Sequence, residues 1–335
     1  MYKEIESNPL SGLNYSFAEY VKQRKEFDSK HVDGNGLPDY AYKMDYEHRK
    51  RIDAIPGLVK FMKKYCSTVI PQELQKYNMS GVMVGPDQFP EIYKMVKECA
   101  ETLGIGIPNV LIVPVIEDAG DFNACTLALD DVEPIILITG LLVERMSPEE
   151  LKVVIAHECG HIHNHHSLYG ILANILTSTG IAGLQSIPGF SELAALLTSG
   201  AQYALSMWSR AAEVTADRAA LICTGDVKVA ANTLSKFMYN GANISRTVKT
   251  EINIDALYDQ LNMILNNPNR INELLNSHPL AVKRVIAVKD FSECETLYKW
   301  RPDLKTPEQT LRTKNEIDEK CKKYIDVLVP KGVQK

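Results

Sequence analysis

The spacing of apolar residues divides the chain into long helical stretches and one short β-rich region. Apolar residues recur at helical spacing over 17–27, 52–66, 90–103 and most of the chain from residue 193 onward. Three intervening runs are largely apolar, at 110–116, 122–129 and 134–139, and the first of them is rich in β-branched residues. Such runs, bounded by Gly, Pro and Asp, are typical of strands. The pattern predicts an α+β fold that is predominantly helical, with a small and mainly antiparallel sheet.

One helix has a strong start signal in the run Ser147-Pro148-Glu149-Glu150. Serine is a favourable N-cap, proline is favourable at the first helical position, and a glutamate three residues after the cap can complete a capping box. We therefore expect a helix from Pro148. Later helix breaks are expected at Gly225, Gly241, Pro268 and Pro279. We divide the chain into a helical N-terminal segment (1–85), a central domain (86–290) and a helical C-terminal extension (291–335).

Composition restricts the partners and the compartment. The 335 residues are 45% hydrophobic and 24% charged, as in a globular protein. A net charge of -5 argues against nucleic-acid binding, which needs a surplus of Lys and Arg. The seven cysteines form no CxxC pair and are odd in number, which favours a reducing compartment. Because the N-terminus also lacks the apolar stretch of a signal peptide, we expect a cytoplasmic protein.

The segment 167–209 leaves membrane association open as the alternative. Its only charged residue is Glu192, and each half is long enough to cross a bilayer. The first half nevertheless contains many Gly, Ser, Thr, Asn and Gln residues together with Pro188. This composition favours buried helices of a soluble core.

Residues 157–161, His-Glu-Cys-Gly-His, form an HExxH motif inside the helix expected from Pro148. Two histidines four residues apart on a helix lie on one face, so the imidazoles of His157 and His161 can reach one metal ion. Glu158 lies beside them, where it can accept a proton from a zinc-bound water and pass it to a leaving amine. The motif predicts one Zn²⁺ per chain and a hydrolytic reaction.

A third ligand is expected from Glu213, which lies one helical turn before Asp217 in a run otherwise rich in Ala, Val and Leu. Charged groups on an apolar helix need partners. Glu213 would bind the metal, and Asp217 would hold a ligand imidazole by its other ring nitrogen. The alternative is an ion-pair network with Arg210 and Arg218.

Three more histidines follow the motif: His163, His165 and His166. We interpret them as helix-end groups or as groups that support a ligand, and metal binding by one of them stays open as the alternative. Cys159 lies inside the motif, two residues from His157, and is expected to pack within the helix rather than act on the metal.

Together, the HExxH motif, the ExxxD pattern of Glu213 and Asp217, and Ser277-His278-Pro279 with Arg284 resemble the zinc metallopeptidases typified by HtpX and the CaaX prenyl proteases, which belong to the gluzincins. The resemblance covers residues 86–290. It implies a zincin-like catalytic domain and a metalloendopeptidase activity on a peptide or protein substrate.

The resemblance also implies roles for individual residues. Glu213 would be the third zinc ligand, and Asp217 would orient a ligand histidine. His278 would donate to the oxyanion formed on the scissile carbonyl, and Arg284 would hold either the Glu213 region or the same oxyanion. Asn123 and Ala124 would lie on the edge strand along which a peptide adds as an extra strand.

Two alternative functions remain at this point. One is a latent or non-catalytic zinc-binding interaction protein of the same fold, in which the N- or C-terminal extension closes the site. The other is a membrane-associated protease. The intact Glu158 and His278 argue against the first, since a non-catalytic protein is free to lose either residue.

Overall fold

The structure, a computed structural model, describes residues 31–32, 37–117, 119–129, 132–173, 199–242, 252–267, 273 and 278–327. The expected helix at 17–27, the break at Pro268 and Ser277 lie outside these residues. So do residues 130–131, between the second and third predicted strands, and most of the segment 167–209.

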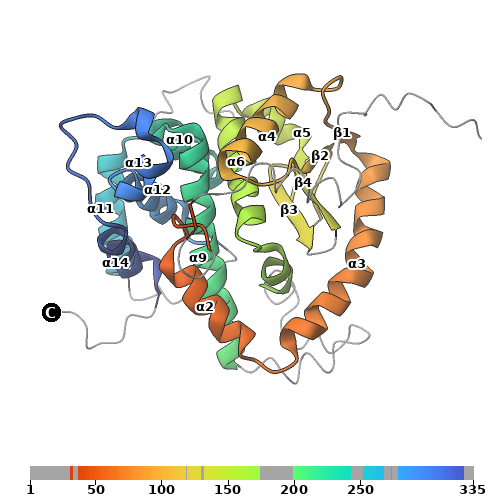
Figure 1. Ribbon diagram of the computed structural model, residues 1–335, viewed down its shortest axis with the longest axis horizontal. Coiled ribbons are helices and arrows are strands. Elements are labelled where there is room, and N and C mark those ends of the chain that lie inside the picture. Colours follow the sequence, from red (N-terminus) through yellow and green to blue (C-terminus); the bar gives the residue numbers. More distant parts are fainter. Residues whose placement is uncertain are drawn as a thin grey trace, which may run out of the picture.

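A small sheet stands on one side of the molecule and a group of helices on the other (Figure 1). The strands are β1 (Val82–Met83), β2 (Asn109–Val113), β3 (Ala124–Leu129) and β4 (Val132–Thr139), in the order β1-β2-β4-β3. The pairs β1–β2 and β3–β4 are antiparallel, whereas β2–β4 is parallel. The predicted α+β class is confirmed, and the sheet is mixed, with two of its three pairings antiparallel.

The central strands are apolar on both faces because helices cover both sides of the sheet. On one face Val110 and Ile136 join the core formed with α4 (Pro90–Leu103) and α6 (Pro148–His163). On the other face Leu111 and Leu137 pack with α3 (Leu58–Ser80). Since successive residues of a strand point to opposite faces, burial on both sides requires continuous apolar runs.

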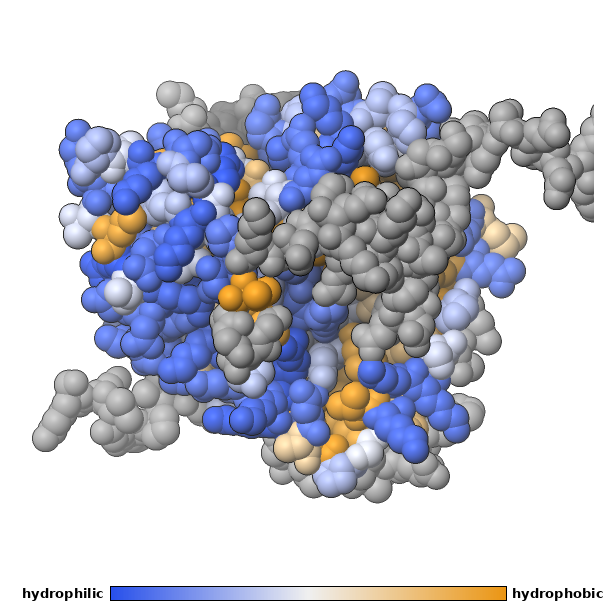
Figure 2. Space-filling view, in the orientation of Figure 1, coloured by the Kyte–Doolittle hydropathy of each residue, from blue (hydrophilic) through white to orange (hydrophobic). Residues whose placement is uncertain are grey.

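The short helix α5 (Gly140–Arg145) lies next to the sheet (Figure 1). The remaining helices lie on the side of α9 (Ser199–Thr224), and they are α2 (Lys43–Asp53), α10 (Val227–Met238), α11 (Ile254–Leu265), α12 (Ala281–Phe291), α13 (Glu295–Trp300) and α14 (Lys314–Ile325). Over α11 and α14 the visible surface is mostly hydrophilic (Figure 2). In the part of the chain that the structure describes, no helix combines the length and apolarity needed to cross a membrane.

The predicted helix at 90–103 is confirmed as α4, but the one at 52–66 is wrong. The chain instead forms two helices, α2 and α3, which are separated at Ala54–Gly57. Pro56 disfavours helical backbone at the residue before it, and Gly57 has φ of 79°, a left-handed conformation that suits glycine. Gly225, with φ of 72°, follows the end of α9 as expected.

The capping box predicted at the start of α6 is confirmed. The Glu150 amide donates to Ser147 Oγ at 3.3 Å, and the Ser147 amide donates to Glu150 Oε2 at 2.7 Å. Lys236 Nζ, from α10, donates to the same carboxylate oxygen at 2.6 Å. These contacts fix the N-terminus of α6 and hence the position of its C-terminal half.

Helix α6 packs against α9 more extensively than any other pair of elements in the described chain. Gly160 permits this close approach. A Cβ atom at this position would lie 2.7 Å from Ala219 Cβ and 3.0 Å from Ala216 Cα, both on α9. The absence of a side chain at 160 therefore lets the two helices bring their polar residues together.

We predict that Gly160→Ala lowers the free energy of unfolding by about 1–3 kcal/mol, because the new methyl group forces α6 away from α9. The matched control is Gly170→Ala, in the helical segment 167–173, where nothing lies within 4 Å of a built Cβ. There the same change should stabilise the protein by up to about 1 kcal/mol. Urea unfolding measures both variants, and equal effects would contradict the close-packing argument.

Candidate metal centre

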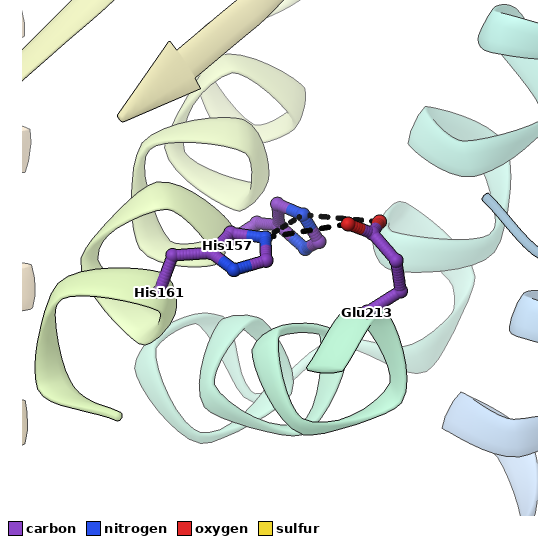
Figure 3. Close-up of side chains that lie close together, drawn as sticks. All are labelled: His157, His161 and Glu213. Atoms are coloured by element: carbon purple, nitrogen blue, oxygen red, sulfur yellow. Dashed lines mark hydrogen bonds and ion pairs between the residues drawn. The ribbon is translucent and has the colours of Figure 1, made fainter. Parts of the chain in front are cut away.

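Three side chains from two helices converge between α6 and α9 (Figure 3). His157 Nε2 and His161 Nε2 lie 3.1 Å apart. Glu213 faces them from α9, with Oε2 3.5 Å from His157 Nε2 and Oε1 3.5 Å from His161 Nε2. One ligand atom from each residue lies within 4.8 Å of the others. The structure thus brings together the three residues that the sequence proposes as metal ligands.

These separations fit one zinc ion. Two ligand atoms bound to a tetrahedral zinc at the usual bond lengths lie about 3.3 Å apart, close to the spacing between the two histidine nitrogens and between each of them and the carboxylate. Two imidazoles and one carboxylate are also a common donor set for catalytic zinc. The residues present therefore fit the metal that the motif predicts.

Asp217 and Arg284 contact His157 and Glu213 on the side away from the proposed metal position. His157 Nδ1 lies 3.0 Å from Asp217 Oδ1, which orients the ring so that Nε2 faces the site. Arg284 donates to both oxygens of Asp217, at 2.8 and 2.7 Å, and its Nη1 lies 2.9 Å from Glu213 Oε2. The resemblance implies that Arg284 holds either the Glu213 region or the oxyanion. In the structure its side chain contacts Glu213 and Asp217.

The alternative ion-pair network with Arg210 and Arg218 is not formed. Arg210 instead pairs with Glu273 at 2.9 Å, and Arg218 pairs with Asp318 at 2.7 Å. Both arginines lie on α9 but point to other partners, whereas Glu213 pairs with Arg284 and His278.

Both acidic groups of the ExxxD pattern stay ionised. Burial alone would raise the pKa of Asp217, but the Arg284 guanidinium and the hydrogen bonds from Arg284 and His157 outweigh it and lower that pKa. Burial likewise opposes ionisation of Glu213, yet His278 and Arg284 hold the pKa of Glu213 well below its ordinary value. An anionic carboxylate is the form that binds a cation.

Glu158 is held by a residue that sequence reasoning missed. Thr126 Oγ1 donates to Glu158 Oε2 at 2.6 Å and also lies 3.2 Å from the Glu158 carbonyl oxygen. Thr126 belongs to β3, the last strand in the sheet order, so an edge strand runs beside the HExxH helix. No local sequence pattern connects the two residues, which are 32 positions apart.

Asn123 and Ala124 lie where β3 begins. The Asn123 amide donates to Thr139 Oγ1 at 3.0 Å, and the Thr139 amide donates to the Asn123 carbonyl at 3.0 Å, so this end of β3 is tied to β4. Ala124 is the first residue of the strand. Ala124 thus lies on the edge strand β3, and Asn123 directly precedes it.

His278 lies against Glu213, with Nδ1 3.1 Å from Oε1. More than half of its side chain is exposed, at 55%, in contrast to the buried Glu213. The segment before α12 therefore places an accessible imidazole beside the proposed ligands.

The other histidines lie at or just after the C-terminal end of α6, and Cys159 lies within this helix. His163 Nδ1 lies 2.9 Å from the Tyr40 hydroxyl. His165 adopts a left-handed conformation with φ of 56°, which ends the helical path of α6. His166 Nδ1 lies 2.9 Å from His161 Nδ1, so this histidine contacts a ligand. Cys159 is fully buried, as expected of a packed helix cysteine.

Comparison with known proteins places this geometry in a family. A model of Peptidase family M48 matches residues 86–292. The plastoglobule-localized metallopeptidase 48 of Arabidopsis thaliana is 31% identical over 227 residues, which cover 66% of this chain and 60% of that protein. A protease HtpX homolog of Moorella thermoacetica is 26% identical over 229 residues, which cover 62% of this chain and 74% of the relative. No solved structure matches the chain significantly.

The helical α+β fold and the HExxH helix that faces the ExxxD helix agree with the HtpX-like resemblance of the sequence. The chain belongs to peptidase family M48. It spans less than two thirds of the Arabidopsis relative, at 60% of that protein's length.

We predict that Arg284→Met lowers the free energy of unfolding of the metal-free protein by about 3–5 kcal/mol, because two buried carboxylates lose their cation. Arg312→Met is the control, since Arg312 pairs with Glu293 and its side chain is 52% exposed. Loss of that surface pair should cost about 1 kcal/mol or less. Urea unfolding in the presence of a chelator compares them, and equal losses would show that Arg284 does not hold the carboxylates.

Proposed function

We propose that the protein is a zinc-dependent metalloendopeptidase in which His157, His161 and Glu213 hold the metal and Glu158 is the general base. The observation that carries the proposal is the convergence of the three ligand atoms beside a carboxylate that Thr126 holds in place. The relatives named as proteases support the same class of reaction.

Zinc bound by these residues would act as a Lewis acid that makes water more acidic and polarises the scissile carbonyl. Glu158 would take the proton of the attacking water and deliver it to the leaving amide nitrogen. The Thr126 hydroxyl donates a hydrogen bond to Glu158 Oε2 and so keeps this carboxylate in one orientation. The other carboxylate oxygen can then accept the proton.

His278 would donate to the oxyanion that forms as water adds to the peptide carbonyl. Its exposure and its position beside Glu213 support this role, since the substrate can reach it. Arg284 would act differently, because its guanidinium is engaged by Asp217 and Glu213. It keeps both carboxylates charged and oriented.

The substrate would be an extended peptide that pairs with β3. An edge strand offers unpaired backbone groups to another chain, and β3 carries Thr126, which contacts the general base. A peptide added at this edge is therefore placed beside Glu158.

We predict that N-methylation of a substrate peptide abolishes its cleavage when the methylated backbone amide is one that would pair with β3. Full cleavage of every N-methylated peptide would contradict strand addition.

The location is proposed to be cytoplasmic, and the supporting observation is that all seven cysteines are free. Cell fractionation tests this proposal. Recovery of the protein in the membrane pellet after carbonate washing would favour the membrane-associated alternative.

We predict that wild type and Glu158→Gln each bind one zinc per chain, whereas the variant loses peptide hydrolysis by about 10²–10⁴-fold, because the general base is removed and the ligands are kept. Elemental analysis and cleavage of a fluorogenic peptide library measure the two properties. Glu319→Gln, which changes an exposed glutamate of α14, is the control and should keep full activity.

The outcomes separate the possible functions. Zinc in both proteins with no cleavage by wild type would favour the non-catalytic zinc-binding alternative. Equal cleavage by wild type and Glu158→Gln would remove Glu158 from the mechanism. Absence of zinc from the wild type would overturn the proposed metal site.

A further inference from the structure

The N-terminal helix α2 brings one acidic residue close to the proposed metal site. Asp45 lies outside residues 86–292, the part of the chain that matches the family model. Its side chain is nevertheless buried, at 3% exposure, against residues of the family domain. A buried carboxylate is costly unless hydrogen bonds or charges compensate it, so its partners indicate its role.

Asp45 reaches His161 through one intervening residue. Asp45 Oδ2 lies 2.8 Å from His166 Nε2, and His166 Nδ1 lies 2.9 Å from His161 Nδ1. The second oxygen, Asp45 Oδ1, accepts a hydrogen bond from Trp208 Nε1 on α9 at 2.9 Å. His166 and Trp208 are as buried as Asp45, so water does not compete for these contacts.

The hydrogen positions in this series of hydrogen bonds, from His161 through His166 to Asp45, follow from metal binding at His161 Nε2. A neutral imidazole that binds a metal through Nε2 carries its hydrogen on Nδ1. His161 Nδ1 must then donate to His166 Nδ1, which leaves the hydrogen of His166 on Nε2. That hydrogen is donated to Asp45 Oδ2. Every donor in this series of hydrogen bonds therefore meets an acceptor, and the Asp45 carboxylate is the last acceptor.

The backbone around His165 is shaped to make this contact possible. His165 has φ of 56°, an unfavourable conformation for a residue other than glycine. The turn directs the chain back on itself, so that the His166 amide donates to the His161 carbonyl at 3.0 Å. This reversal places the His166 ring against the His161 ring, which a continued helix would not do.

The two proposed histidine ligands thus have equivalent supports. His157 is held by Asp217, which Arg284 fixes in turn. His161 is held by His166 and Asp45, which Trp208 fixes in turn. A carboxylate that accepts the outer hydrogen of a metal-binding imidazole fixes the ring orientation and makes the ligand nitrogen more basic.

We propose that Asp45 is a positioning residue of the zinc site, acting through His166 on His161, and that helix α2 is for this reason a functional part of the metallopeptidase unit. The proposal rests on the zinc site described under the proposed function. It follows that removal of the first 85 residues would weaken the metal site rather than release a latent activity.

The test is the zinc affinity of the full-length Asp45→Asn variant, measured by competition with a chromogenic chelator. We expect binding about 10–100-fold weaker than in wild type, because the carboxylate that orients the His166–His161 pair is lost. Asp53→Asn is the matched control. It makes the same change on the same helix, where Asp53 contacts the Tyr169 hydroxyl and no ligand, and should leave the affinity unchanged.

A second variant separates positioning from folding. His166→Phe removes the intervening ring while filling a similar volume, and it should weaken zinc binding at least as much as Asp45→Asn. If Asp45 acts only through His166, adding Asp45→Asn to His166→Phe should cause no further loss. Affinities are compared at equal folded fraction, determined from the circular dichroism of the metal-free proteins.

Each result has a distinct meaning. Wild-type affinity in folded Asp45→Asn, or losses that multiply in the double variant, would overturn the positioning role while leaving the zinc site intact. If Asp45→Asn does not fold, wild-type affinity in His166→Phe would overturn it equally. Failure of the wild type to bind zinc would overturn both the proposed function and this inference.

Discussion

The close contact between α6 and α9 is the constraint on which the site depends. Gly160 lies between the two histidines that α6 presents, and its missing side chain lets Ala216 and Ala219 of α9 approach. Since Glu213 and Asp217 lie on the same helix as these alanines, the contact that packs the core also sets the distances between Glu213 and the two histidines. The capping box at Ser147 fixes the start of α6, so the helix keeps one register relative to α9.

The electrostatic organisation follows from burying charged groups in this contact. Glu213 and Asp217 would be costly inside the protein without a cation, and Arg284 supplies one by pairing with both. A metal cation at the same place would add to this compensation. The second histidine has its own buried carboxylate in Asp45, which comes from a helix beyond the family domain. The N-terminal helix thus contributes a buried carboxylate to the hydrogen-bonded group next to His161.

What the sequence could predict was mostly local. The HExxH motif, the capping box and the ExxxD spacing each lie within one helix, where fixed geometry relates residues three or four apart. The contacts of Thr126 with Glu158 and of Asp45 with His166 join residues 32 and 121 positions apart, so helix periodicity cannot predict them. Asp45 shares the buried face of α2 with Met44, His48 and Ile52, and this helix itself was not predicted from the sequence. The helix at 52–66 was wrong because the break at Pro56 and Gly57 outweighs the apolar spacing around it.

The most direct test of the account is the anomalous scattering of crystals of the wild-type protein grown with zinc, recorded on both sides of the zinc absorption edge. We expect one strong peak between α6 and α9, within about 2.0–2.2 Å of His157 Nε2, His161 Nε2 and a Glu213 oxygen. A peak bound by other side chains, or no peak between the two helices, would contradict it.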